Sequence, residues 1–268
     1  MSSMIIFGGT KGIGDCLAQY YKKNGFKVSV IARHPEGEGM RNRINVIKAD
    51  VSKETVVERA FDLHLKCWGQ APDIVINCAA IQGPIGNSWE IPVKKFEETL
   101  RINLLGCFIV SKAAIKRMMP AGCGSIVVFS GGGAVYGRPN FSAYGVSKTG
   151  ILRMVETMAG ELKNAGYSDI IINAISPGAV KTGMTEEILK AGQKAGKIAL
   201  EEATQIIKNG GTSAQEIIDL VNFLIDTKLN NGLTGRLVHV REDYRKLVKE
   251  FGNNIPEEIG KIRRIPIK

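Results

Sequence analysis

Short runs of apolar residues recur along the chain, and most are followed by a loop or an amphipathic stretch. The seven runs that we interpret as strands cover residues 4–7, 27–32, 44–48, 74–77, 125–130, 170–175 and 237–240. Because these runs are continuously apolar, both of their faces must be covered by helices, which is typical of parallel strands. The pattern predicts an α/β fold: a single-domain, doubly wound parallel sheet of about seven strands with helices on both faces.

Start and stop signals delimit the helices between these strands. The first helix begins at Gly12 and ends at Asn24-Gly25. Further helices are predicted from after Ser52 to about Trp68 and from Pro92 through Met119, and the capping-box sequence SAQE at 213–216 begins a late one.

One segment departs from the strand–helix pattern. Residues 177–212 are rich in Lys, Ala, Glu and Gly and have helical propensity without a strong apolar stripe. Because they follow the end of a predicted strand, they would lie over the mouth of the sheet. We predict a substrate lid over 177–212, with a surface pair of helices as the alternative. One domain would then span 1–241, followed by a tail extension over 242–268.

Composition narrows the class of protein. The net charge is +10, but the charges are scattered, and no basic–aromatic stripe or nucleic-acid motif accompanies them. No apolar run approaches the roughly 18–20 residues of a membrane span. No two cysteines form a CxxC pair, so we expect no metal site and reduced thiols in a cytoplasmic protein; they are Cys16, Cys67, Cys78, Cys107 and Cys123.

A glycine-rich turn follows the first predicted strand and opens the first helix. Its sequence is GGTKGIG at 8–14, with the spacing Gly8-x3-Gly12-x-Gly14. Glycine lets the backbone approach a pyrophosphate, and the helix N-terminus presents free N–H groups to that anion. The turn predicts a Rossmann-type dinucleotide site that includes Gly8, Thr10, Lys11, Gly12, Ile13 and Gly14.

The end of the second predicted strand indicates which dinucleotide binds. An NAD enzyme usually has a carboxylate there for the ribose 2′-hydroxyl, but this chain has Ala32 followed by Arg33. A guanidinium suits a 2′-phosphate, and Lys11 could reach the same group. The sequence therefore favours NADP(H) as the cofactor.

A tyrosine and a lysine stand four residues apart at the start of a predicted helix. The spacing puts Tyr144 and Lys148 on one face, so the ammonium is expected to lower the pKa of the phenol. A phenol of this kind can give a proton to a carbonyl oxygen or take one from an alcohol.

Over roughly residues 3–241 the chain resembles the short-chain dehydrogenase/reductase family, in its NADP-using form. The motifs appear in the family's order: GGTKGIG at 8–14, Asp50-Val51, Asn77-Cys78-Ala79-Ala80, Asn103, Tyr144 with Lys148, and Pro177-Gly178-Ala179-Val180-Lys181-Thr182. The stretch 130–148 also resembles, more loosely, a bacterial subgroup linked to cell-surface carbohydrate pathways.

This resemblance implies a role for each matched residue. Asp50 and Val51 would lie beside the adenine, and Asn77 and Ala79 along the cofactor. Asn103 would hold a proton-relaying water, Tyr144 would be the general acid/base, and Lys148 would also bind the nicotinamide ribose. The nicotinamide pocket would be shaped by Pro177, Gly178, Val180 and Thr182. The family also implies a homodimer or homotetramer, packed through the helices after Pro92 and Ser142.

The chain departs from the family pattern in three ways. Cys78 and Ala80 replace residues of the usual NNAG motif, and Phe7 stands where a Thr commonly precedes the first glycine. The third departure concerns the substrate-orienting Ser, expected 13 residues before the Tyr, where this chain has Gly131. Either the adjacent Ser130 takes over that role, or the substrate has another donor.

The function we expect is an NADPH-dependent carbonyl reductase, reversible as an alcohol dehydrogenase, acting on a small molecule. Candidate substrates are a keto-sugar, a nucleotide-sugar or a 3-ketoacyl compound. The alternative is a catalytically weak NADP(H)-binding sensor or scaffold, which Gly131 motivates. Neither nucleic acid nor a membrane is an expected partner.

Overall fold

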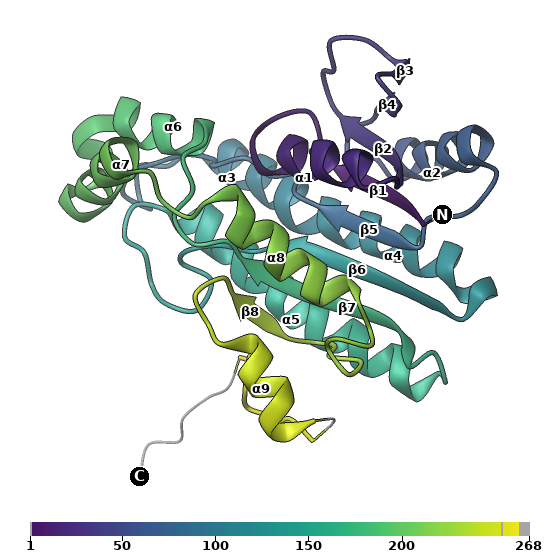
Figure 1. Cartoon of the computed structure of the whole chain (residues 1–268). Helices are drawn as coiled ribbons and strands as arrows, with labels where there is room; N and C mark the ends of the chain where they lie inside the picture. The colour runs from purple at the N-terminus through teal and green to yellow at the C-terminus, as the bar shows by residue number, and fades with distance from the viewer. Residues whose placement is uncertain (1, 253, 263–268) are drawn as a thin grey trace.

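A central parallel sheet organises the chain, as the apolar runs predict. The structure is a computed structural model and describes residues 2–252 and 254–262. Eight strands pair in the order β3-β4-β2-β1-β5-β6-β7-β8 (Figure 1). Their bounds are β1 (Ser3–Phe7), β2 (Lys27–Ala32), β3 (Gly39–Arg41), β4 (Ile44–Lys48), β5 (Ile74–Asn77), β6 (Cys123–Phe129), β7 (Asp169–Ser176) and β8 (Leu237–His239). All pairings are parallel except that of β3 with β4, so the predicted doubly wound α/β sheet is confirmed.

The eighth strand, β3, is an element that the apolar pattern did not predict. It is three exposed residues long and pairs antiparallel with β4 through a tight turn at Asn42 and Arg43. Both turn residues have positive φ, 46° and 65°, as a two-residue hairpin with the natural strand twist requires. The hairpin extends the edge of the sheet without adding to the core.

In residues 2–252 and 254–262, twelve helical segments connect or flank the strands. They are α1 (Gly12–Lys23), α2 (Glu54–Trp68), α3 (Val93–Leu100), η1 (Arg101–Leu105), α4 (Gly106–Met118), η2 (Met119–Ala121), α5 (Ser142–Asn164), α6 (Gly183–Ala191), η3 (Gly192–Ala195), α7 (Lys197–Asn209), α8 (Ala214–Ile225) and α9 (Tyr244–Phe251). The predicted capping box is present, since Ser213 Oγ accepts a hydrogen bond from the Glu216 N–H. The predicted second helix begins at Glu54 rather than directly after Ser52, because the backbone of Lys53 is still extended.

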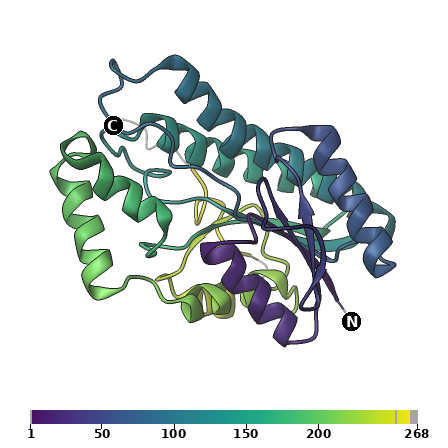
Figure 2. The same ribbon diagram turned by 90° about the horizontal axis from the view of Figure 1, so that it is seen from above.

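The helices form two layers around the sheet (Figures 1 and 2). Side chains of α2, α4 and α5 form one core with the strand residues Ile5 and Phe7. Those of α1, α8 and α9 form the other core with Met4 and Ile6. Because successive strand residues point to opposite faces, each strand serves both cores, which explains its continuous apolar sequence.

The helix predicted over 92–119 is interrupted. Pro92 is the N-cap of α3, and residues 101–105 then form a π-helical turn before α4 begins at Gly106. This turn contains Asn103, whose side chain is buried. The proline at 120 lies in a short 3-10 turn after α4, so the predicted stop is close to the observed one.

The predicted lid segment contains two helices that pack on each other. Helices α6 and α7 lie together at one end of the molecule, beyond the carboxyl ends of the strands (Figures 1 and 2). A separate small cluster joins Ala195 and Ala199 to Phe141, with Tyr144 packed against it. The segment is therefore attached to the start of α5.

The part of the tail that the structure describes folds back onto the domain. Tyr244 of α9 packs against Phe223 of α8, with ring centroids 4.7 Å apart. Residues 253 and 263–268 of the predicted tail lie outside the described residues. Within the described chain, no helix is both long and apolar enough to cross a membrane.

Candidate active site

A cavity of about 1000 Å³ opens at the carboxyl ends of the strands. This edge is where open α/β sheets bind ligands. Sixteen of the site residues predicted from the sequence line it: Gly8, Thr10, Lys11, Gly12, Ile13, Gly14, Arg33, Asp50, Val51, Ala79, Tyr144, Lys148, Pro177, Gly178, Val180 and Thr182. Asn77 and Asn103 are buried behind this lining. The cavity thus brings together residues from the whole length of the domain.

The glycine-rich turn is packed too tightly for side chains. A Cβ on Gly8 would lie 2.8 Å from the main-chain N of Ala79, and one on Gly14 would lie 2.3 Å from the Gly8 carbonyl oxygen. At Gly12 the space is open, and the nearest atom is a methyl carbon of Thr182 at 3.8 Å. The turn is therefore a backbone cradle that faces the segment after β7, and its shape fits a diphosphate group.

Arg33 and Asp50 lie at the end of the cavity where β2 and β4 finish. Burial alone would raise the pKa of Asp50, but two hydrogen bonds from Ser52 and the charges of Arg33 and Lys53 outweigh it and lower that pKa. Asp50 is thus ionised at neutral pH and close enough to Arg33 to interact with it electrostatically. No carboxylate replaces Ala32 at the end of β2.

Two asparagines fix the backbone that forms the cavity floor. Asn77 Oδ1 accepts a hydrogen bond from the Ala79 N–H at 3.1 Å. Asn103 makes a pair of hydrogen bonds with Ile81: Oδ1 accepts from its N–H, and Nδ2 donates to its carbonyl oxygen, each at 2.9 Å. Asn103 Nδ2 also donates to Ser147 Oγ at 3.1 Å, which connects the π-helical turn to α5 beside Tyr144. In this structure Asn103 acts on the scaffold of the site.

Tyr144 and Lys148 share one face of α5, as their spacing predicts. Lys148 is buried, its Nζ donates to the Phe129 carbonyl oxygen at 2.8 Å, and it lies 5.5 Å from the centroid of the Tyr144 ring. Burial lowers the pKa of Lys148 to about 8. The expected lowering of the phenol pKa is wrong for this structure: burial raises the pKa of Tyr144 to about 12, and the nearby charge that opposes the increase is Arg138. Tyr144 is therefore protonated at neutral pH and able to donate.

Gly131 leaves no side chain beside the phenol. A Cβ at this position would lie 2.8 Å from Tyr144 Oη, closer than real Cβ contacts. The hydroxyl of Ser130 donates to the main-chain oxygen of Lys148 at 3.2 Å. In this structure that hydroxyl is thus committed to the backbone, which disfavours Ser130 as the substitute for the missing serine.

The segment after β7 forms the opposite wall. Its residues Pro177, Gly178, Val180 and Thr182 all line the cavity. The Val180 carbonyl accepts a hydrogen bond from Thr185 Oγ1 at 2.9 Å, and the Ala179 carbonyl accepts one from the Thr212 N–H at 2.7 Å. These bonds fix both ends of the predicted lid to the cavity wall.

Several lining residues were not predicted from the sequence. Gln82, Tyr136 and Arg138 line the cavity from loops, where neither periodicity nor spacing singles them out. Arg138 forms an ion pair with Glu202 of α7, with Nη2 2.7 Å from the carboxylate.

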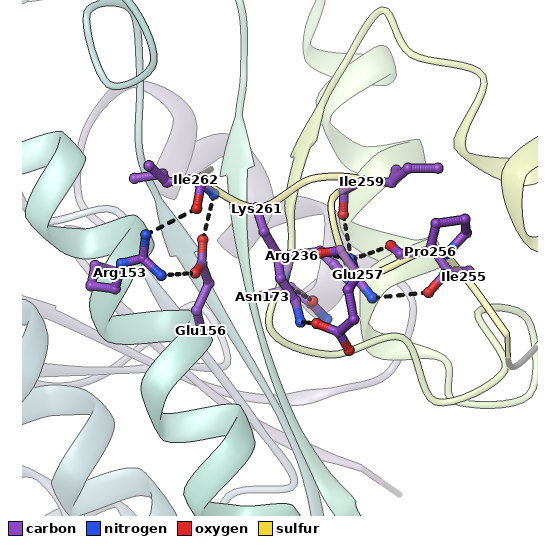
Figure 3. Close-up of polar contacts among 10 residues, drawn as sticks. All are labelled: Arg153, Glu156, Asn173, Arg236, Ile255, Pro256, Glu257, Ile259, Lys261 and Ile262. Atoms are coloured by element: carbon purple, nitrogen blue, oxygen red, sulfur yellow. Dashed lines mark hydrogen bonds and ion pairs between the residues drawn. The ribbon is translucent and has the colours of Figure 1, made fainter. Parts of the chain in front are cut away.

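The described tail also contributes to the cavity, through residues 260–262. Figure 3 shows the polar contacts that hold this part of the tail. The buried guanidinium of Arg236 donates to the carbonyl oxygens of residues 255, 256, 257 and 259. On the other side, Arg153 and Glu156 of α5 bind the backbone carbonyl and N–H of Ile262. The tail is therefore held against β8 and α5 of its own chain. No signal in the sequence distinguishes Arg236 as its anchor.

Metal-binding side chains do not gather in this structure. Across residues 2–252 and 254–262, no group of three or more His, Cys, Asp or Glu side chains is placed to hold an ion.

Comparison with known proteins agrees with this site. A family model described as enoyl-(acyl carrier protein) reductase matches residues 8–242. Two relatives from Arabidopsis thaliana are a chloroplastic NADPH-dependent aldehyde reductase-like protein and short-chain dehydrogenase reductase 5. The first is 27% identical over 82% of this chain and 86% of its own length; the second is 29% identical over 82% and 86%.

Solved structures share the whole fold. A variant of actinorhodin polyketide ketoreductase with NADPH superimposes with a TM-score of 0.77 at 25% identity, covering 89% of this chain and 95% of the other. NAD⁺-bound xylitol dehydrogenase superimposes with a TM-score of 0.77 at 26% identity, covering 89% and 96%. With a family match over most of its length and motifs that meet in one cavity, the chain belongs to the short-chain dehydrogenase/reductase family of oxidoreductases, which use a nicotinamide cofactor.

Proposed function

We propose that this protein is a cytoplasmic, NADPH-dependent carbonyl reductase whose general acid/base is Tyr144. The observation that carries the proposal is one cavity that holds the glycine cradle, Arg33 and the Tyr144–Lys148 pair. A cofactor bound along the cradle and a carbonyl beside the phenol would thus share a single space.

The protonation state of Tyr144 supports the reductive direction. A bound nicotinamide supplies the hydride. Tyr144, with its pKa raised to about 12 by burial, carries the proton that the developing alkoxide needs. Lys148 is held by the Phe129 carbonyl behind the ring and places positive charge near it. In the reverse direction the same phenol has to lose its proton first, so oxidation of an alcohol needs a higher pH.

The choice of NADP(H) over NAD(H) rests on charge. Arg33 and Lys11 line the cavity, while Ala32 stands at the end of β2. A guanidinium binds a 2′-phosphate through charge-assisted hydrogen bonds and gains much less from a neutral hydroxyl. Asp50 reduces the net charge there but has hydrogen bonds from Ser52 to satisfy it.

The remaining assignments follow from the family. The helices α6 and α7 would act as a substrate lid, and α4 and α5 would pack against a second copy in a homodimer or homotetramer. Keto-sugars, nucleotide-sugars and 3-ketoacyl compounds remain the candidate substrates.

The test is a comparison of NADPH and NADH oxidation with a panel of aldehydes and ketones. The wild type should oxidise NADPH faster. Tyr144→Phe should bind NADPH normally yet lose at least about a hundredfold in kcat, since general acid catalysis contributes about that much. Tyr167→Phe, a tyrosine that does not line the cavity, is the matched control. Turnover that survives in Tyr144→Phe would overturn the proposal.

The alternative is an NADP(H)-binding sensor or scaffold with little catalysis, which Gly131 favours because it removes a donor from the site. Tight NADPH binding without turnover of any carbonyl compound by the wild type would support this alternative.

A further inference from the structure

Three consecutive glycines, 131–133, lie in a loop of the cavity wall, and the side chains of Tyr144, Tyr136 and Arg138 approach the first two of them. A Cβ on Gly131 would lie 2.8 Å from Tyr144 Oη. One on Gly132 would lie 3.1 Å from Tyr136 Oη and 3.2 Å from Arg138 Nη1. A phenol, a second hydroxyl and a guanidinium thus share the space that side chains at these positions would fill.

Tyr136 and Arg138 approach the same point from a loop that lines the cavity. Their Oη and Nη1 atoms lie within 3.1 and 3.2 Å of the single Cβ position on Gly132, although Tyr136 is more than half exposed. No hydrogen bond to another described residue engages Nη1. Both side chains also line the cavity, so a hydroxyl and a cationic N–H donor are available there to an oxygen-bearing ligand.

The rest of the Arg138 side chain is held in place. Its Nη2 pairs with Glu202 of α7, and its guanidinium lies 4.8 Å from the centroid of the Phe141 ring. Because a guanidinium has five N–H donors in a fixed plane, the pairing through Nη2 orients Nη1 without using it. Arg138 is therefore presented to the cavity as a preorganised cation.

The Arg138 guanidinium lies on the same side of the cavity as the Tyr144 phenol. Gly131 and Gly132 are adjacent in sequence, so the phenol and the guanidinium lie over neighbouring backbone positions. The charge of Arg138 also acts on Tyr144, where it opposes the effect of burial on the phenol pKa. Because both side chains line the same cavity, a ligand with its carbonyl at Tyr144 and an oxyanion elsewhere in the same small molecule would contact both.

We propose that Arg138, assisted by Tyr136, binds an oxyanion of the substrate, a carboxylate or a phosphate, so that the enzyme prefers anionic carbonyl compounds to neutral ones. This inference rests on the proposed carbonyl reductase and narrows its substrate class. Arg138 is a specificity-determining residue in this scheme, and the proton still comes from Tyr144.

The kinetic test uses matched pairs of substrates: a short oxo acid with its methyl ester, and a ketose phosphate with its free ketose. The wild type should have the higher kcat/KM for the anionic member of at least one pair, which also identifies the oxyanion. Arg138→Gln should reduce that anion-to-neutral ratio about tenfold or more, because it removes a charge-assisted hydrogen bond to the anion. Tyr136→Phe removes one hydroxyl and should reduce it about threefold. Arg59→Gln, an exposed arginine of α2, is the matched control.

A binding measurement separates this inference from the proposed reaction. Calorimetric titration of NADPH-loaded enzyme with an alkanoate, an alkyl phosphate and the corresponding amide needs no turnover. Anion binding that depends on Arg138 supports the inference even if no carbonyl compound is reduced. Equal affinity for anion and amide, an unchanged substrate ratio in Arg138→Gln, or a weaker NADPH affinity in that variant would overturn it, the last because Arg138 would then serve the cofactor.

Discussion

A methyl group added at Gly131 tests whether the position of the Tyr144 phenol controls turnover. In Gly131→Ala the new Cβ would lie 2.8 Å from Tyr144 Oη, whereas ordinary contacts begin at 3.4 Å. The phenol oxygen must therefore retreat by about 0.6 Å. The backbone does not resist the change, since Gly131 is absent from the residues with positive φ.

The magnitude follows from how precisely the site must be aligned. A misplacement of about 1 Å can cost about a hundredfold in rate, so a shift of about 0.6 Å should cost roughly tenfold or more in kcat. Tyr144 packs against the cluster around Phe141, which limits how far its ring can move without further loss. The free energy of unfolding should change little. Replacing Gly by Ala reduces the conformational freedom of the unfolded chain, which stabilises the fold by about 0.4–1 kcal/mol and offsets the cost of the new contact.

The assay combines steady-state NADPH oxidation with NADPH affinity and thermal unfolding. We expect a lower kcat, with NADPH affinity and midpoint temperature close to the wild type. Gly131→Ser is the informative companion, because it restores the family's hydroxyl together with the same Cβ. If Gly131→Ala retained wild-type kcat, the steric argument would be refuted. If only Gly131→Ser gained activity, a missing donor would be the limiting factor instead.

Three further predictions concern the cofactor, the tail and the core. Arg33→Ser should weaken NADPH binding about tenfold or more and leave NADH binding nearly unchanged, as measured by fluorescence titration; an equal loss for both would contradict the role of Arg33. Arg236→Met removes the anchor of residues 255–259, so trypsin should cut at Lys261 much faster than in the wild type, whereas equal rates would show that the guanidinium does not hold the tail. Buried His64 hydrogen-bonds to Ser29, and burial with the charge of Lys27 lowers its pKa from 6.5 to about 4. The folded state therefore keeps the imidazole neutral, while the unfolded state takes up a proton below pH 6.5. The part of the free energy of unfolding that is present above pH 6.5 is thus lost as the pH falls, by about 2 kcal/mol at pH 5. Urea unfolding of His64→Gln should lack this loss, and a pH dependence identical to the wild type would exclude His64 as its source.

The sheet was predictable because its signal is local and repeated. Each buried strand is a mostly apolar run, and most of the motifs that line the cavity stand at strand ends, where the topology brings them together. The edge strand β3 was missed because its residues are exposed and it is defined by turn geometry at Asn42 and Arg43. The π-helical turn was missed because its inward residue, Asn103, is held by hydrogen bonds to Ile81, far from it in sequence.

The charges and pKa values in the site were harder to predict from the sequence than the identity of the residues that form it. The spacing of Tyr144 and Lys148 correctly puts them on one face, but the pKa of the phenol depends on how much of the surrounding fold excludes water. Arg138 has no motif of its own, and its side chain is held by Glu202 of α7 and by the ring of Phe141. Such contributions depend on tertiary contacts that no periodic pattern encodes.

The π-helical turn between α3 and α4 makes chain length, more than residue identity, the sensitive property of this stretch. An α-helix turns by about 100° per residue, and the wider turn over 101–105 absorbs one surplus residue without rotating α4 relative to α3 by that amount. Deleting a single residue there would permit an unbroken α-helix, but it would turn the Asn103 amide relative to α4 and away from its partners Ile81 and Ser147. A conservative exchange of Leu104 is therefore a smaller perturbation than its removal.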